Sequence, residues 1–212
     1  TTRVCSKIKL NTYIMISYET VIEFEQKLAK FFGSKFAVCT DCCTHAIELC
    51  LRYTNANDVV CPARTYLSIP MTLIKLNLKW RWKDYPWQDW YKLDNTNIID
   101  GANHWTQDGY IKNTFMCISF QFKKPLSLGR GGAILCDSQE DYMALKKMTH
   151  DGRDPTTNKQ WKEHNIESIG YHYYMTPETA QQGISKMYKT IKVKTWTDQD
   201  YPYLPDYKVF AK

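Results

Sequence analysis

The chain of 212 residues is 43% hydrophobic and 24% charged, which is typical of a globular protein and is enough for one sizeable domain. It lacks a run of about eighteen apolar residues and the pattern of a signal peptide, so we expect no membrane contact and a cytoplasmic location. The net charge of +6 and the 14% aromatic content would suit a nucleic-acid binder, but basic residues are interspersed with acidic ones.

Helices and strands are predicted to alternate along the chain. In order, we predict a helix over 20–32, a strand over 35–40, a helix over 43–53, a strand over 58–62, a helix over 65–77, strands over 78–84, 96–102, 115–120 and 131–137, and helices over 138–152 and 176–191. Gly33 is a typical helix stop and Ser138 a typical N-cap. Pro70 is expected either to kink its helix or to lie in the first turn.

The predicted strands are mostly short, continuous apolar runs. Their alternation with helices predicts an α/β fold with a mainly parallel sheet flanked by helices. Ligands of such sheets bind beyond the carboxyl ends of the strands. Residues 42–44, Thr65-Tyr66, Asp100 and residues 119–132 all follow strands in this way. We therefore expect them to converge on one site.

The chain contains eight cysteines. Seven lie mostly in apolar segments, where a free thiol behaves as a small hydrophobic group; these are Cys39, Cys42, Cys43, Cys50, Cys61, Cys117 and Cys136. Cys39 and Cys42 have CxxC spacing but no second pair to complete a zinc site. The sequence therefore predicts structural thiols and no metal.

The converging residues could supply what a pyridoxal phosphate ligand needs. A lysine of "SFQFKKPLSLGRGG" would form the Schiff base, Asp100 would pair with the pyridine nitrogen, and Tyr66 would offer an aromatic face. The phosphate would find donors at the start of a helix and at a nearby hydroxyl, namely at Cys42, Cys43, Thr44 and Ser119. Alternatives remain open: Asp100 as a strand-end turn residue, Tyr66 as core packing, and Thr44 as an ordinary N-cap.

Six segments in chain order resemble the DegT/DnrJ/StrS family of PLP-dependent sugar aminotransferases, a branch of fold type I. They are "FEQKLAKFFGSKFAV", "CTDCCTHAIELCL", "DVVCPARTYLS", "IIDGANHW", "SFQFKKPLSLGRGGAIL" and "IGYHYYMTPETAQQGISKM". The resemblance implies a reduced fold-type I large domain over 1–190, a C-terminal extension over 191–212, and little or no C-terminal domain.

The resemblance also implies site residues. The family's Schiff-base lysine lies five residues after the serine and seven before the paired glycines, which selects Lys124 rather than Lys123 as the catalytic residue. Asn103 is implied to bind the cofactor. His172 lies in a loop that, in this family, reaches across a homodimer interface towards the neighbour's cofactor phosphate.

Several positions depart from the family pattern. The connection between Asp84 and Asp100 is short, Arg130 stands in place of a glutamate, and His172 and Tyr174 replace an asparagine and an arginine. The resemblance nevertheless implies an aminotransferase that converts a keto-sugar nucleotide to an amino-sugar nucleotide, with a glutamate- or glutamine-type donor. The alternative is a catalytically degenerate protein of the same fold with a binding or structural role. A dehydratase of this family would lack the lysine, and a nucleic-acid binder would explain none of the ordered motifs.

Overall fold

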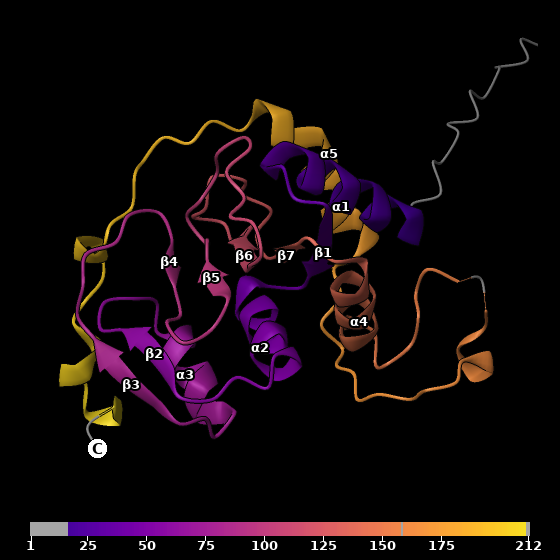
Figure 1. The fold of residues 1–212 in the computed structure, drawn as a ribbon. Helices are drawn as coiled ribbons and strands as arrows, with labels where there is room; N and C mark the ends of the chain where they lie inside the picture. The colour runs from indigo at the N-terminus through magenta and orange to yellow at the C-terminus, as the bar shows by residue number, and fades with distance from the viewer. Residues whose placement is uncertain (1–16, 158, 211–212) are drawn as a thin grey trace, which may run out of the picture.

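A computed structural model describes residues 17–157 and 159–210 (Figure 1). Its α-helices are α1 (Tyr18–Phe32), α2 (Cys43–Tyr53), α3 (Ser68–Lys75), α4 (Gln139–Thr149) and α5 (Pro177–Lys186). Its strands are β1 (Phe36–Thr40), β2 (Val59–Pro62), β3 (Trp80–Lys83), β4 (Tyr91–Lys92), β5 (Ile98–Asp100), β6 (Phe115–Ser119) and β7 (Gly132–Cys136). Every predicted helix and strand is present, and β4 is an addition.

The main sheet is mixed, so the prediction of a mainly parallel sheet is wrong. Its strand order is β1-β7-β6-β5-β4, while β2 and β3 form a separate parallel pair. β7 runs antiparallel to β1 and β6, β4 runs antiparallel to β5, and β5 and β6 are parallel. A continuous apolar run indicates that both faces of a strand are buried, but it does not indicate whether the strand runs parallel or antiparallel to its neighbours. β6 returns to β7 through residues 120–131 without a crossover helix, and such a connection suits an antiparallel pair.

Local signals at the helix ends explain the boundaries. Gly33 takes a φ of 78° after α1, a left-handed conformation that glycine adopts at little cost. The Ser138 side chain accepts hydrogen bonds from the backbone N–H groups of Glu140 and Asp141 at the start of α4. Pro70 lies in the first turn of α3, where its missing N–H has no helical partner to lose. All three expectations are confirmed.

Helices cover both faces of the main sheet. Met116 and Leu135 point to the face that packs against α1, whereas Cys117 and Ile134 point to the face that packs against α2. Adjacent residues of a strand point to opposite faces, and helices cover both faces. Every residue of β6 and β7 is therefore buried. α1 and α5 lie together on the first face, as Figure 1 shows.

Residues 191–210, which we call the C-terminal segment, run back from α5 past β4 towards β2 and β3 (Figure 1). The Asp89 N–H donates to the Trp196 carbonyl at 2.7 Å, and the Trp196 N–H donates to Asp89 Oδ1 at 3.0 Å. Further along, the Leu204 N–H donates to the Ala63 carbonyl at 2.9 Å. The segment therefore packs on the preceding part of the chain; the division into units 1–190 and 191–212 stays a prediction.

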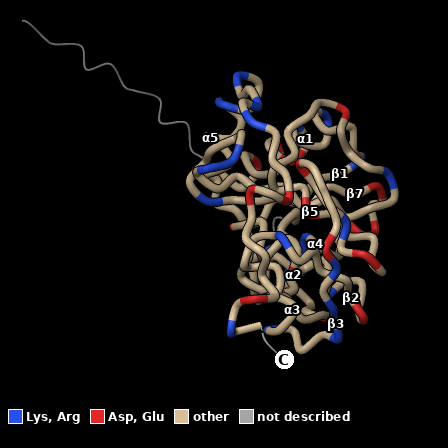
Figure 2. Tube along the Cα trace, turned by 90° about the vertical axis from the view of Figure 1, so that its left-hand side faces the viewer, with Lys and Arg blue, Asp and Glu red and all other residues tan. Residues whose placement is uncertain are grey.

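Lysine and arginine residues alternate with acidic residues along the trace rather than gathering on one broad face (Figure 2). None of the described helices has the length and apolarity needed to cross a bilayer.

The seven cysteines of the described ranges are free thiols, and all but Cys42 are buried, which confirms their predicted structural character. Cys5 lies outside the described residues.

Candidate active site

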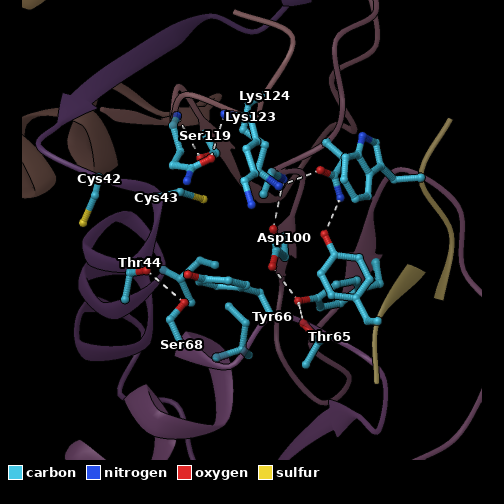
Figure 3. Close-up of a pocket in the computed structure, with 18 of the residues that line it drawn as sticks. Cys42, Cys43, Thr44, Thr65, Tyr66, Ser68, Asp100, Ser119, Lys123 and Lys124 are labelled. Carbon is cyan, nitrogen blue, oxygen red and sulfur yellow. Dashed lines mark hydrogen bonds between the residues drawn. The ribbon is translucent and has the colours of Figure 1, made fainter. Parts of the chain in front are cut away.

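A cavity of about 370 Å³ lies where the main sheet, the start of α2 and the C-terminal segment meet (Figure 3). Of the predicted site residues, the cavity is lined by Cys42, Cys43, Thr44, Tyr66, Asp100, Asn103, Ser119 and Lys124. The expectation that these distant segments converge is confirmed.

Lys124 projects its amine into this cavity. Its Nζ donates to Asn103 Oδ1 at 2.6 Å and lies 5.5 Å from the centre of the Trp196 ring. Burial lowers the pKa of Lys124, and the nearby Asp100 and Cys43 partly oppose this effect. A buried amine with a depressed pKa is closer to the neutral, nucleophilic form. Lys123 also reaches the cavity, but it is exposed and its Nζ lies over the Phe122 ring.

Asp100 faces the amine from the end of β5 (Figure 3). Its carboxylate accepts hydrogen bonds from the Tyr91 hydroxyl at 2.5 Å and from the Ala102 N–H at 2.9 Å. Tyr91 is held in turn by a hydrogen bond with Thr65. Burial raises the pKa of Asp100, and the hydrogen bonds from Tyr91 and Ala102 together with the charge of Lys124 oppose that rise. The carboxylate is therefore fixed in position and orientation.

The start of α2 opens on the cavity. Within the described structure, the Cys42 side chain at the N-cap accepts no hydrogen bond from the first turn. Helix N-termini with free N–H groups attract anions. The Thr44 hydroxyl donates to Ser68 at 2.9 Å, which joins α2 to α3 beside this opening. A Cβ added at Gly132 would lie 2.5 Å from the Cys43 nitrogen, so glycine there lets β7 approach the helix start closely.

A charged cluster lies at the rim next to Cys42. The Asp41 carboxylate accepts a hydrogen bond from Arg130 at 2.7 Å and forms another with His45 Nδ1 at 2.6 Å. Asp41, Cys42 and His45 have ligand atoms within 4.8 Å of one another, a spacing that a metal ion could bridge. Arg130 already supplies a cation to Asp41 and reaches within 3.9 Å of the Cys42 sulfur. We therefore interpret the cluster as an ion-pair network.

Two of the predicted site residues take less expected positions. Tyr66 lines the mouth of the cavity with 61% of its surface exposed. His172 does not line this chain's cavity; it is exposed, and its Nδ1 bonds to Asp151 at 3.0 Å. The neighbouring Tyr173 stacks on His45 with ring centroids 3.6 Å apart, so this loop is docked on its own chain. A role for His172 at a neighbour's phosphate stays a prediction.

Sequence reasoning missed the aromatic wall of the cavity. Trp87, Tyr91, Trp196 and Tyr201 line it together with Asp89. The signal available was the clustering of aromatic residues in "KTWTDQDYPY", which no helical or strand periodicity accompanies. The C-terminal segment thus supplies one wall of the cavity through Trp196 and Tyr201.

The sequence matches the DegT/DnrJ/EryC1/StrS aminotransferase family over residues 3–93 and 107–199. The chain belongs to this family, whose members use pyridoxal phosphate. Asp100 and Asn103 fall between the two matched segments, so their assignment depends on where the structure places them. No curated protein sequence matches this chain.

Solved structures share the fold. A candidate sugar aminotransferase, Spr1654 from Streptococcus pneumoniae, superposes with a TM-score of 0.66 at 18% identity over 80% of this chain. PseC from Helicobacter pylori, an aminotransferase involved in the biosynthesis of pseudoaminic acid, gives 0.64 at 14% identity over 80%. The aminotransferase from Psychrobacter cryohalolentis gives 0.63 at 14% identity over 81%. The chain spans 58%, 57% and 56% of these three proteins, respectively.

The residues of the cavity fit pyridoxal phosphate. The volume falls within the range of about 300–1,000 Å³ that small-molecule sites occupy. A buried amine, an opposed carboxylate and an uncapped helix start lie around one space. In that order, the three groups offer an amine to bond the cofactor, a partner for its protonated ring nitrogen and a binding place for its phosphate.

Proposed function

We propose that this protein is a pyridoxal-phosphate-dependent aminotransferase that converts a keto-sugar nucleotide to an amino-sugar nucleotide. An amino-acid donor of the glutamate or glutamine type would supply the nitrogen. The observation that carries the proposal is that the Lys124 amine and the Asp100 carboxylate line the same cavity and interact electrostatically. Membership of the aminotransferase family supports it. We propose further that the protein acts in the cytoplasm as a homodimer.

The bound cofactor would supply an electron sink that stabilises negative charge on a substrate carbon. Lys124 would hold the cofactor through its amine and, once released, would accept and return a proton at Nζ. Asp100 would hold the ring nitrogen in its protonated form. The first turn of α2, with Thr44 and Ser119, would hold the phosphate.

Three further groups would cover the cofactor, orient the amine and shield the reactants. Tyr66 at the mouth would cover a ring face, and Asn103 would orient the lysine amine. The aromatic wall that includes Trp196 would exclude water, which strengthens electrostatic interactions inside the site.

The test is to add pyridoxal phosphate to the purified protein and to record a near-visible absorption band. Borohydride reduction followed by peptide mapping should place the cofactor on Lys124. Lys124→Ala should abolish the band and the exchange of amino groups with glutamate. The matched control, Lys123→Ala, should retain both. Attachment to Lys123 or to another lysine would contradict the assignment.

One observation favours the alternative of a degenerate protein with a binding or structural role. The Cys43 side chain stands at the helix start and lines the cavity beside the expected phosphate, where a smaller side chain would leave more room. If the protein binds pyridoxal phosphate without exchanging amino groups with any donor, this alternative is favoured. If Cys43→Gly then tightens cofactor binding, the thiol is the cause.

A further inference from the structure

The Asn103 side chain connects the Lys124 amine to the C-terminal segment. Its Oδ1 accepts a hydrogen bond from Lys124 Nζ at 2.6 Å, and its Nδ2 donates to the Tyr201 hydroxyl at 3.0 Å. Asn103 is 4% exposed and lines the cavity. Both ends of one buried amide are therefore occupied, one by the reactive amine and one by a tyrosine 98 residues along the chain.

The orientation of this amide matters because its two ends act oppositely on an amine. An amide oxygen accepts a hydrogen bond and favours the charged ammonium, whereas an amide nitrogen donates and favours the neutral amine. A charged ammonium only donates and so selects the amide oxygen, and a group on the far side of the amide can then anchor it in that position. Tyr201 occupies that side, and its ring packs on Trp87 with centroids 5.3 Å apart. Burial raises the pKa of Tyr201 to about 12, so it stays a neutral phenol at physiological pH.

We propose that Tyr201 is a positioning residue: its hydroxyl accepts from the Asn103 amide nitrogen and anchors the amide whose oxygen accepts from the Lys124 amine. The importance of that amine in catalysis rests on the proposed function. Tyr201 lies beyond residues 107–199, the second segment that matches the family. The family match therefore does not assign it a role.

Other groups that act on the Lys124 amine come from different elements. Asp100 faces it from the end of β5 and Cys43 from the start of α2, and both raise its pKa against the effect of burial. The Trp196 ring lies 5.5 Å away. Replacing the Tyr201 hydroxyl alone leaves all three groups in place. A change in Lys124 after that replacement would therefore report on the amide.

The experiment measures the reactivity of Lys124 in the full chain without cofactor. Acetic anhydride labelling across neutral and alkaline pH, followed by mass spectrometry of the Lys124 peptide, gives the midpoint of its ionisation. Tyr201→Phe should lower this midpoint by about one pH unit, because the oxygen is no longer held on the ammonium. Tyr203→Phe is the matched control, since the Tyr203 ring packs over Arg64, and it should leave the midpoint unchanged.

A second variant tests whether Tyr201 acts on the amine through Asn103. Asn103→Ala should shift the midpoint in the same direction, and adding Tyr201→Phe to it should give no further shift, because the two residues act in one chain of hydrogen bonds. An unchanged midpoint in a folded Tyr201→Phe variant, or additive shifts in the double variant, would overturn the proposal.

Failure of the proposed function would look different. A wild-type protein without an absorption band after addition of pyridoxal phosphate would refute the aminotransferase assignment. The labelling midpoint requires no cofactor, so it would still decide whether Tyr201 controls the amine.

Discussion

Glu25 of α1 and Lys146 of α4 form an ion pair that is buried on both sides. Lys146 Nζ lies 2.8 Å and 3.0 Å from the two carboxylate oxygens of Glu25. The Lys146 side chain is 0% exposed and the Glu25 side chain 3% exposed. Glu25 also accepts from the Cys39 N–H, and Lys146 donates to the Tyr18 hydroxyl. This pair ties α1, β1 and α4 together.

Lys146→Met should destabilise the protein by about 3–5 kcal/mol at neutral pH, because it leaves a buried carboxylate without its cation. The double variant Glu25→Leu with Lys146→Met should recover most of that loss. Urea denaturation followed by circular dichroism measures both. Lys27→Met, which breaks the exposed pair with Glu23, is the control and should cost about 1 kcal/mol or less. Equal stability of Lys146→Met and the wild type would disprove the role of the buried pair.

Asp100→Asn should retain part of the cofactor binding but slow amino-group exchange by about 100-fold, because a neutral amide does not hold a proton on the ring nitrogen. Stopped-flow absorbance after mixing with glutamate gives the rate. Asp94→Asn, which changes an exposed residue paired with Lys83, is the control. Unchanged exchange in Asp100→Asn would dismiss the assigned role.

His45 should contribute stability that depends on pH. Partial burial acts to lower its pKa, but the hydrogen bonds with Asp41 and Cys42 outweigh burial and raise the pKa to about 9. A raised folded-state pKa stabilises the protein fully below the unfolded value of about 6.5, and this contribution disappears as pH rises through about 9.

His45→Gln should therefore lower the free energy of unfolding by about 1 kcal/mol at pH values near 6. Above about pH 10 it should have little effect, because His45 is then neutral in both states. Denaturation midpoints across this range test the prediction. A loss of stability that is the same at both extremes would show that charge is not the cause.

Gly132→Ala should displace the start of α2, because the added Cβ would lie 2.5 Å from the Cys43 nitrogen and 2.6 Å from the Cys42 carbonyl carbon. We expect at least a 10-fold loss of affinity for pyridoxal phosphate, equivalent to about 1.4 kcal/mol. A Cβ added at Gly129 would meet no atom within 4 Å, but Gly129 has a φ of +84°, which an alanine adopts only with strain. Gly129→Ala should reduce stability by about 1 kcal/mol while cofactor affinity is retained. Equal affinities in the two variants would contradict the close-approach explanation.

The predicted homodimer can be tested by sedimentation with the cofactor bound. Lys124→Ala and His172→Ala should each be inactive, and mixed dimers should regain part of the activity if His172 acts at the neighbour's phosphate. Unmixed samples of each variant are the controls. A fully active monomer would refute the shared site.

The sequence was informative where it resembles a family motif of fixed spacing. That resemblance, through the spacing of Ser119, Lys124 and Gly131, distinguishes two adjacent lysines, and the structure places Lys124 as the more buried of the two. Strand ends could be predicted from apolar runs, so Asp100 was found at the edge of the sheet. The assignment of these residues to cofactor binding stays a prediction that the experiments above address.

Other features could not be predicted because they depend on contacts between distant segments. Strand direction in the sheet follows from how residues 120–131 return, and apolar content does not record this. The C-terminal segment is built from short 3-10 turns such as Asp198–Asp200 and Leu204–Asp206, which lack the periodicity of helices and strands. The aromatic residues of this segment can be read from the sequence, but their position at the cavity cannot.

The C-terminal segment also bears on the order of folding. Its hydrogen bonds join residues 107, 111 and 137 positions apart, so each closes a long loop of chain. Contacts of such high sequence separation tend to form late, after local structure has reduced the entropy of closure. The sheet with Lys124 and Asp100 can thus assemble while the cavity is still an open groove. Native-state hydrogen exchange should find that residues 191–210 open before β6 and β7, so that this wall separates from the sheet without unfolding it.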